Sequence, residues 1–405
     1  MQEIDVLVVG AGPAGSAAAA AAARAGAKTL LIDRKKEIGT PVQCGEVIGK
    51  SLLQQAGIKL PRQAVCRNQA STRFLIDRRL MVVNREPYWA SVTVERKILD
   101  KLFAVGAAEA GARVEADTRL TELHMEGDQV EEAILMQRGK EVRVKPRMVI
   151  AADGVHSTVS KLTGFRWYPE EMVARGGEFE MVSKKPLPPS MQIILEPEVG
   201  LGYGWIIPKG KNRANVGLAR VGASGNRMRM LEEWVEDHPL LSRYFDGDSI
   251  LEVKTGDAPV PGVCGDTVRG NIIFTGDAAG QTLAFVGEGI IPSYVCGMAA
   301  GEAAASYDSS LYGEYLDGTL GEELRYGADL KDQILGLWED ETLNDAQRVL
   351  IAGLVMSECL VPEDLEMLLI TDPNKGSGLI GGLRQKLRAE GRDITVSPIS
   401  PGRKR

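Results

Sequence analysis

Three glycines near the N-terminus have the spacing of a phosphate-binding turn. Gly10, Gly12 and Gly15 lie between an apolar run and an alanine-rich segment. In such a turn the first glycine permits the tight bend, the second lets a pyrophosphate approach the backbone, and the third lets helix and strand pack closely. Asp33 follows at the end of the next apolar run, where a carboxylate can accept hydrogen bonds from ribose hydroxyls. The pattern predicts a bound dinucleotide.

Two aspartates farther along the chain indicate which dinucleotide this is. Asp153 ends the apolar run MVIAADG, and Asp277 opens the segment GDAAGQTLAFVGEGI. A carboxylate such as that of Asp277 suits the hydroxyls of a ribityl chain. A helix beginning near residues 287–290 can offer N–H groups to the flavin N1/O2 edge, which becomes anionic on reduction. Each motif alone is typical of an ordinary turn, but their order and their places after strands favour FAD.

The hydrophobic pattern predicts the elements that position these residues. Residues 4–10 and 28–33 are short, continuous apolar runs, which is typical of buried parallel strands. The alanine-rich segment 14–25 between them is a strong helix former that ends at Gly26. Together they form a Rossmann-like βαβ unit.

The rest of the chain predicts an α/β protein, α+β overall. Residues 71–95 read as hairpins, residues 95–110 as an amphipathic helix, and residues 165–260 as alternating strands of an antiparallel sheet. We expect three domains: an FAD-binding domain of residues 1–164 with 261–305, an antiparallel-sheet substrate domain of residues 165–260, and a helical C-terminal region of residues 306–405 with a mobile basic tail.

The composition argues against two classes of function. A net charge of −7 and a pI near 5.4 do not suit nucleic acid as a partner. The histidines, His124, His156 and His238, are not spaced with other metal ligands, so we expect no metal site. Five cysteines without a CxxC pair fit a reducing cytoplasm. No apolar run reaches the roughly 18 residues of a spanning helix, so we expect any membrane contact to be peripheral, at the inner face.

The motifs resemble those of the aromatic-hydroxylase flavoproteins. Within that superfamily the chain is similar to the geranylgeranyl reductase family, especially the archaeal digeranylgeranylglycerophospholipid reductases. The likeness covers residues 1 to about 300 and rests on KEIGTPVQCGE, TVERKILDKLF, GYGWIIP and GDAAG with GEGI. It implies reduction of C=C bonds in geranylgeranyl chains of membrane ether-lipid precursors, by hydride from flavin N5 plus a proton. It also implies an external electron donor, which NAD(P)H, a ferredoxin or a deazaflavin would each satisfy.

The resemblance also implies which residues contact FAD. The cysteine loop QCGE lies beside the flavin in that family, the arginine matched by Arg96 meets the phosphates, and the backbone at the position of Leu120 meets the adenine. The expected cofactor-binding residues are Gly10, Gly12, Ala14, Gly15, Asp33, Arg34, Cys44, Gly45, Val47, Arg96, Leu120, Asp153, Asp277, Gly287, Gly289 and Ile290.

The segment GYGWIIP resembles the family's substrate motif, Pro-x-x-Tyr-x-Trp-x-Phe-Pro. Tyr203, Trp205 and Pro208 match it and are the expected substrate-binding residues, whereas Gly200 and Ile207 depart from it. On a strand, Tyr203 and Trp205 place two flat faces on one side, which suits a wall for an isoprenoid chain. An ordinary aromatic core pair is the alternative.

Cys44 and Glu288 are the candidate catalytic residues. The Cys44 thiol could donate a proton near flavin N5 or serve only as a small apolar filler. Glu288 stands where relatives have a third glycine, and Ala284 where they have proline. An acid there could supply a proton or disfavour the flavin anion; a solvated loop glutamate is the simpler interpretation.

Two other functions share the FAD motifs. A flavin-dependent monooxygenase of a phenol or quinone would need a polar pocket near N5, against which GYGWIIP argues. A non-catalytic, flavin-bearing carrier of prenyl lipid would leave double bonds untouched. Basic residues near the C-terminus could assist contact with a membrane in either lipid-binding case: Arg384, Lys386, Arg388, Arg403, Lys404 and Arg405.

Overall fold

The first sheet of the protein is built on the predicted βαβ unit. The computed structural model describes residues 1–222, 226–247, 249–263, 265, 267–360 and 376–399. β1 (Gln2–Val9), α1 (Pro13–Arg24) and β2 (Thr29–Ile32) form the unit, and β1 pairs in parallel with β2 and with β11. The other strands of this sheet are β8 (Arg113–Glu115), β9 (Thr118–Glu126), β10 (Gln129–Gln137), β11 (Lys140–Ala151), β17 (Val268–Arg269) and β18 (Ile272–Phe274).

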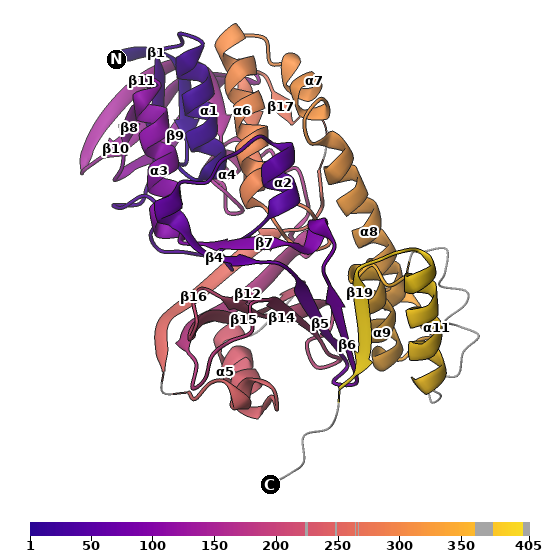
Figure 1. Cartoon of the computed structure of the whole chain (residues 1–405). Helices are drawn as coiled ribbons and strands as arrows, with labels where there is room; N and C mark the ends of the chain where they lie inside the picture. The colour runs from indigo at the N-terminus through magenta and orange to yellow at the C-terminus, as the bar shows by residue number, and fades with distance from the viewer. Residues whose placement is uncertain (223–225, 248, 264, 266, 361–375, 400–405) are drawn as a thin grey trace.

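Small residues let two helices pack closely over this sheet (Figure 1). α6 (Ile290–Ser306) lies against α1, and α3 (Arg96–Glu109) lies on the other side of α1. A Cβ at Gly297 would lie 2.1 Å from the carbonyl oxygen of Ala14, and a Cβ at Gly301 2.2 Å from that of Ala18. The alanine-rich sequence of α1 is therefore explained by close backbone contact with α6.

The second sheet lies below the first in Figure 1 and carries the GYGWIIP segment. Its strand order is β16-β12-β15-β14-β13-β5-β6-β19, and its pairs are antiparallel except β13 with β5. α5 (Arg227–Asp237) covers one face. The strands are β5 (Thr72–Ile76), β6 (Leu80–Asn84), β12 (Val173–Val182), β13 (Met191–Leu195), β14 (Gly202–Pro208), β15 (Arg213–Val221), β16 (Ile250–Pro259) and β19 (Ile394–Pro398).

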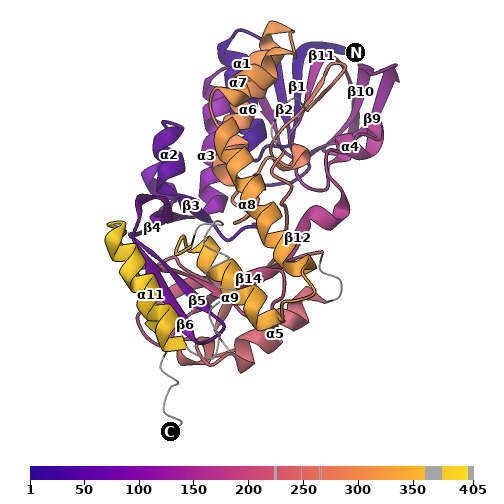
Figure 2. The same ribbon diagram turned by 90° about the vertical axis from the view of Figure 1, so that its right-hand side faces the viewer.

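A small third sheet and the C-terminal helices join these two parts. β3 (Val47–Gly49), β7 (Ser91–Val94) and β4 (Val65–Gln69) form the third sheet. α8 runs from the side of the first sheet to the side of the second (Figures 1 and 2). Within the described residues, the remaining helices longer than one turn are α2 (Lys50–Gln55), α4 (Thr158–Thr163), α7 (Leu311–Asp317), α8 (Gly321–Glu339), α9 (Asp345–Met356) and α11 (Gly376–Ala389).

Two features differ from the expected organisation. Residues 394–398 were expected in a helical region with a mobile tail, but they form β19, which pairs with β6; Arg403, Lys404 and Arg405 lie outside the described residues. β5 and β6 belong to the second sheet although they come from residues 72–84. Both differences arise because strand pairing joins segments that are distant in sequence. The three domain boundaries stay a prediction.

The contact between α1 and α6 gives a stability prediction. Alanine normally stabilises a helix by about 1 kcal/mol relative to glycine. We expect Gly297→Ala instead to destabilise the protein by about 2 kcal/mol, because its methyl group would overlap the Ala14 carbonyl. Urea unfolding measures the change. The matched control is Gly106→Ala in α3, where no atom lies within 4 Å of the added Cβ. Equal effects of the two substitutions would contradict the prediction.

Candidate functional site

The glycine turn has the geometry that its spacing predicts. Gly10 has a φ of +100°, and its N–H donates to the Ile32 carbonyl at 2.8 Å. A Cβ at Gly15 would lie 1.7 Å from the Gly10 carbonyl oxygen, so helix and strand can meet only with glycine here. Around Gly12, by contrast, no atom lies within 4 Å of a Cβ position. Gly12 thus leaves its backbone open to a ligand at the beginning of α1.

A first cavity of about 610 Å³ lies in front of this turn. It extends between the ends of β1, β2 and β11, which is the usual place for a ligand in an open parallel sheet. Of the residues predicted to bind the cofactor, it is lined by Gly10, Gly12, Ala14, Asp33, Arg34, Arg96, Leu120, Asp153 and Asp277.

The hydrogen bonds of two carboxyl groups in the first cavity, those of Asp33 and Asp153, show whether this cavity fits FAD. Asp33 accepts hydrogen bonds at 2.8 Å from the N–H groups of Ala11 and Lys35, which fixes it beside the turn. Asp153 accepts from two backbone N–H groups of α4 through Oδ2. Its Oδ1 is buried without a partner among the described residues, and burial raises the pKa of this carboxyl. A buried carboxylate oxygen without a partner in the described chain, such as Asp153 Oδ1, can accept a hydrogen bond from a ligand hydroxyl. Asp33 and Asp153 therefore fit the ribose and polyol hydroxyls of FAD.

Arg96 and Asp277 lie where the first cavity meets a second one. The Arg96 guanidinium binds both oxygens of Asp100, at 2.7 and 2.9 Å. Burial raises the pKa of Asp277 to about 6, against the opposing effect of the Arg96 charge. Residues that the sequence analysis missed also line both cavities: Pro13, Gln43, Thr255, Gly256, Asp257 and Ser293. Pro13 and Gln43 adjoin predicted positions, whereas nothing local in the sequence marks Asp257.

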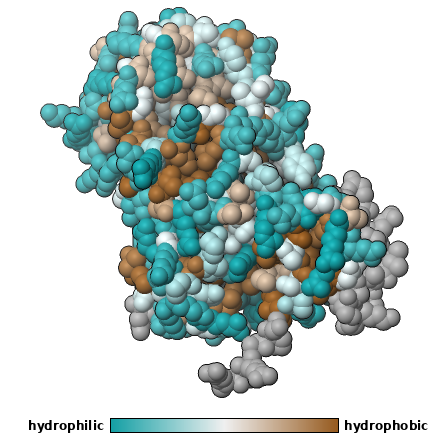
Figure 3. Space-filling model, in the orientation of Figure 1, coloured by the Kyte–Doolittle hydropathy of each residue, from teal (hydrophilic) through white to brown (hydrophobic). Residues whose placement is uncertain are grey.

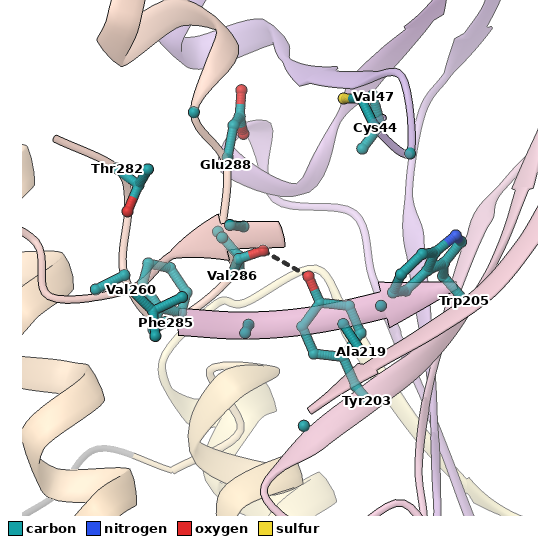
Figure 4. Close-up of a pocket in the computed structure, with 18 of the residues that line it drawn as sticks. Cys44, Val47, Tyr203, Trp205, Ala219, Val260, Thr282, Phe285, Val286 and Glu288 are labelled. Atoms are coloured by element: carbon teal, nitrogen blue, oxygen red, sulfur yellow. Dashed lines mark hydrogen bonds between the residues drawn. The ribbon is translucent and has the colours of Figure 1, made fainter. Parts of the chain in front are cut away.

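The second cavity, of about 340 Å³, is mostly apolar (Figure 4). One wall is the loop with Cys44, Gly45 and Val47, another is the segment with Gly287, Gly289 and Ile290, and a third is β14. From β14 it receives Tyr203, Trp205 and Ile207. Pro208 points to the opposite face because side chains alternate along a strand. Its position does not support the expected substrate contact, and Ile207 takes that place.

The polar ends of the two aromatic residues are both hydrogen-bonded to other residues of the cavity wall. The Tyr203 hydroxyl donates to the Val286 carbonyl, and the Trp205 indole N–H donates to Glu178 Oε2 at 2.7 Å (Figure 4 shows the first bond). The ring centroids are 5.9 Å apart. With their polar atoms satisfied, both rings offer apolar surface to the cavity.

Cys44 and Glu288 both line this cavity. Cys44 Sγ accepts from the Glu46 N–H at 3.2 Å, and burial raises the pKa of the thiol, so it stays protonated near neutral pH. Glu288 accepts from the Gly49 N–H at 3.0 Å, and burial raises its pKa to about 7. The interpretation of Glu288 as a solvated loop residue is therefore wrong, because its carboxyl faces a largely apolar cavity.

The difference between Gly12 and Gly15 gives a test of the first cavity. We expect Gly12→Val to fold with a melting temperature within a few degrees of the parent but to retain at least about tenfold less FAD, since its side chain fills the ligand's space. Gly15→Val should not fold stably, because its Cβ has no room. Flavin absorbance after gel filtration, with circular dichroism for folding, measures both. Full flavin retention by Gly12→Val would contradict the proposed place of the pyrophosphate.

Known proteins match this chain in sequence. The family model for the FAD binding domain matches residues 3–290. The digeranylgeranylglycerophospholipid reductase of Methanocaldococcus jannaschii is 38% identical over 74% of this chain and 76% of that protein. That of Methanococcus aeolicus is 36% identical over 75% and 76%, respectively.

Solved structures agree with this match. A geranylgeranyl bacteriochlorophyll reductase-like protein of Thermoplasma acidophilum has a TM-score of 0.75 and 26% identity, over 91% of this chain and all of that one. A myxobacterial FAD-dependent halogenase, with a TM-score of 0.61 and 17% identity over 83% of each chain, shares the fold alone. The α/β fold with FAD as cofactor is thus confirmed, and the chain belongs to the digeranylgeranylglycerophospholipid reductase family of oxidoreductases.

Proposed function

We propose that this enzyme reduces C=C bonds in the geranylgeranyl chains of membrane ether-lipid precursors. The observation that carries the proposal is the apolar second cavity, which meets the FAD-fitting first cavity at Arg96 and Asp277. An unactivated alkene has no oxygen that a protein can bind, so shape and apolar contact must hold it. The names of the relatives support the same substrate class.

Bound FAD in its reduced form supplies the hydride, and the protein must do the rest. Tyr203 and Trp205 give the chain a flat wall, and Ile334, Trp338 and Met356 of α8 and α9 extend the apolar lining. Such walls exclude water and orient a double bond. Cys44 and Glu288 stay proposed as proton sources, because the thiol is protonated at neutral pH and the carboxyl is about half protonated at pH 7.

Contact with the membrane surface belongs to this proposal. Among the described helices, none combines the length and the apolar character needed to cross a bilayer. Figure 3 shows an apolar hollow between α2 and α3 on the face in view. Lys50 begins α2, and Lys59 and Arg62 follow it along the chain, which suits anionic lipid. The apolar side chains of α2, α3 and the first turn of α6 that are not fully buried include Leu53, Ile98, Leu102, Phe103, Val105 and Tyr294.

The C-terminal basic residues suit this role less well. Arg384 Nε donates to the Val396 carbonyl at 2.8 Å, and Lys386 lies 3.7 Å from Glu390. We therefore propose that α2 and α3 form the membrane-facing surface of the protein. This surface would contact the inner face of the membrane. We further propose that an external donor, NAD(P)H, a ferredoxin or a deazaflavin, reduces the cofactor.

The function is tested with chemically reduced protein under anaerobic conditions. We expect a geranylgeranyl lipid in detergent to gain two hydrogens per reduced double bond, measured by mass spectrometry. Trp205→Ala should lower kcat/KM by at least about tenfold while FAD stays bound, because an aromatic side chain buries much apolar surface. Unchanged lipid mass with intact binding would favour a carrier, and hydroxylated product in air would favour a monooxygenase.

The membrane-facing surface is tested separately by flotation with vesicles of phosphatidylcholine and phosphatidylglycerol. We expect Val105→Asp to lower the bound fraction about fivefold, because a charge cannot enter the lipid interface cheaply. Val253→Asp on β16 is the control, since Val253 is 60% exposed and Val105 48%. Equal loss for both variants, or none for Val105→Asp, would place the contact elsewhere.

A further inference from the structure

A buried group of charged side chains lies beside Trp205, and three of its members, Glu46, Glu178 and Lys254, line the second cavity. Its centre is Glu46, which follows the cysteine loop and is fully buried. Glu46 Oε2 accepts from Lys209 at 2.7 Å, from Lys254 at 2.9 Å and from Asn215 at 2.9 Å. Glu46 Oε1 accepts from the Arg96 backbone N–H at 2.8 Å. With four donors, Glu46 is held as a carboxylate, and its pKa falls to about 2.

The two lysines connect Glu46 to three further carboxyl groups. Lys254 also donates to Glu178 Oε1 at 3.0 Å. Lys209 also donates to Glu180 at 2.9 Å and lies 3.0 Å from Glu95. The Glu95 side chain is 19% exposed, whereas those of Lys209 and Glu46 are completely buried.

These contacts form a continuous chain from the surface to the cavity. The order is Glu95, Lys209, Glu46, Lys254 and Glu178, and no step is longer than 3.0 Å. Glu178 ends the chain and lines the second cavity. Proton transfer between side chains requires hydrogen-bond distance at every step, which this chain provides.

The charges of this group do not balance if every carboxyl is ionised. It holds four carboxyls, Glu46, Glu95, Glu178 and Glu180, but three cations, Lys209, Lys254 and Arg213, which binds Glu180 at 2.8 Å. The nearby guanidinium of Arg96 is paired with Asp100, and that of Arg67 keeps its charge but binds backbone carbonyls rather than a carboxyl of this group. Glu46 and Glu178 share Lys254, and a proton on one of these two carboxyls removes the cost of a buried carboxylate that shares its cation.

Glu178 is the carboxyl that best holds this proton. It shares Lys254 with Glu46, and the one donor to its second oxygen in the described part of the chain is the neutral Trp205 indole. The other groups that face it are Asn215, through Lys254, and the Cys44 loop, since a Cβ at Gly45 would lie 3.6 Å from Glu178 Oε2. Burial raises its pKa to about 7, against the effect of Lys254.

We propose that Glu178 delivers the proton for alkene reduction and regains it from solvent along this chain. Lys254 gives a proton to the Glu178 carboxylate and is reloaded by a Lys209 proton that passes over the Glu46 carboxylate, and Glu95 returns a solvent proton to Lys209, so that every other group regains its starting charge. The proposal rests on the proposed function. For each double bond, a hydride from the reduced cofactor and the Glu178 proton form two C–H bonds while the π bond breaks. Glu178 becomes a carboxylate, and the external donor later restores the reduced cofactor.

Repeated turnover distinguishes Glu178 from the other two candidates. A geranylgeranyl chain has several double bonds, so the reduction of one lipid consumes several protons. Each of them must reach the apolar second cavity. Among the described residues, Glu288 accepts from the backbone N–H of Gly49, and Cys44 accepts from that of Glu46 and also bonds to the Arg96 guanidinium. A backbone N–H and an arginine, which stays protonated, do not pass a proton on, whereas the Glu178 chain leads to the partly exposed carboxyl of Glu95.

The protonation of Glu178 is tested without any turnover. A carboxyl whose pKa is raised from 4.5 to about 7 adds stability below pH 4.5, and this stability is lost as the pH rises through 7. Glu178→Gln lacks this dependence, so we expect it to match the parent's melting temperature at pH 4.5 and to exceed it increasingly as the pH rises, by a few degrees at pH 8. Glu180→Gln, which removes an ionised group whose pKa is lowered, should be destabilised at both pH values. A pH-independent loss for Glu178→Gln, equal to that of Glu180→Gln, would overturn the proposal.

The delivery step is tested with reduced holoenzyme and a geranylgeranyl lipid in detergent. We expect Glu178→Gln to slow a single turnover about 100-fold at pH 7, and Glu95→Gln to slow repeated turnover severalfold more than the first. Glu252→Gln is the matched control, because Glu252 lies on β16 near Lys254 but pairs with Lys97 at 3.0 Å outside the chain. A large loss for Glu288→Gln or Cys44→Ser, with Glu178→Gln unaffected, would overturn the assignment. If the parent leaves the lipid unreduced, the proposed function fails, whereas the stability experiment still decides the state of Glu178.

Discussion

The ionic contacts of Glu46 join the two halves of the site. Glu46 belongs to the loop that carries Cys44, and its lysine partners come from the end of β14 and from β16 of the second sheet. It has a φ of +64°, a conformation that costs a non-glycine residue on the order of 1 kcal/mol or more. Two lysines and Asn215 hold the carboxylate there. The position of the cysteine loop relative to the substrate wall therefore depends on buried charges rather than on apolar packing.

This arrangement explains why a charged group is tolerated beside an apolar cavity. A buried ion pair stabilises a fold only when every charge is matched and hydrogen-bonded. Here Lys209 and Lys254 each bind three oxygens, and Glu46 accepts at both of its own. Among the described residues of this group, Glu178, at the cavity end, shares its lysine with Glu46. An ionised Glu178 that shared Lys254 with Glu46 would weaken the fold, so Glu178 favours holding a proton. This proton lies at the second cavity, where the proposed reduction would consume it.

The sequence predicted those parts of the site that depend on local geometry. The roles of Gly10, Gly12 and Gly15 follow from their spacing, because strand, turn and helix are adjacent in the chain. The position of Pro208 does not support its predicted substrate contact, because the family motif lists positions without their faces, whereas strand alternation separates Pro208 from Tyr203 and Trp205. β19 was missed because its partner, β6, lies over 300 residues earlier. The Glu46 contacts span 163 and 208 residues, so no local pattern could reveal them.

Glycines in the second sheet show how its two faces are kept distinct. A Cβ at Gly217 would lie 2.5 Å from the Trp205 ring, and a Cβ at Gly204 would lie 2.3 Å from the Trp234 ring on the α5 side. Each tryptophan thus packs directly on backbone, one on each face of the same strands. Trp205 is held flat by Gly217 below it and by Glu178 at its N–H. The orientation of Trp205 is therefore fixed in part by the carboxyl that ends the proposed proton chain. A change in the charge of Glu178 changes the hydrogen bond that it accepts from the Trp205 indole, and so acts directly on the wall formed by Tyr203 and Trp205.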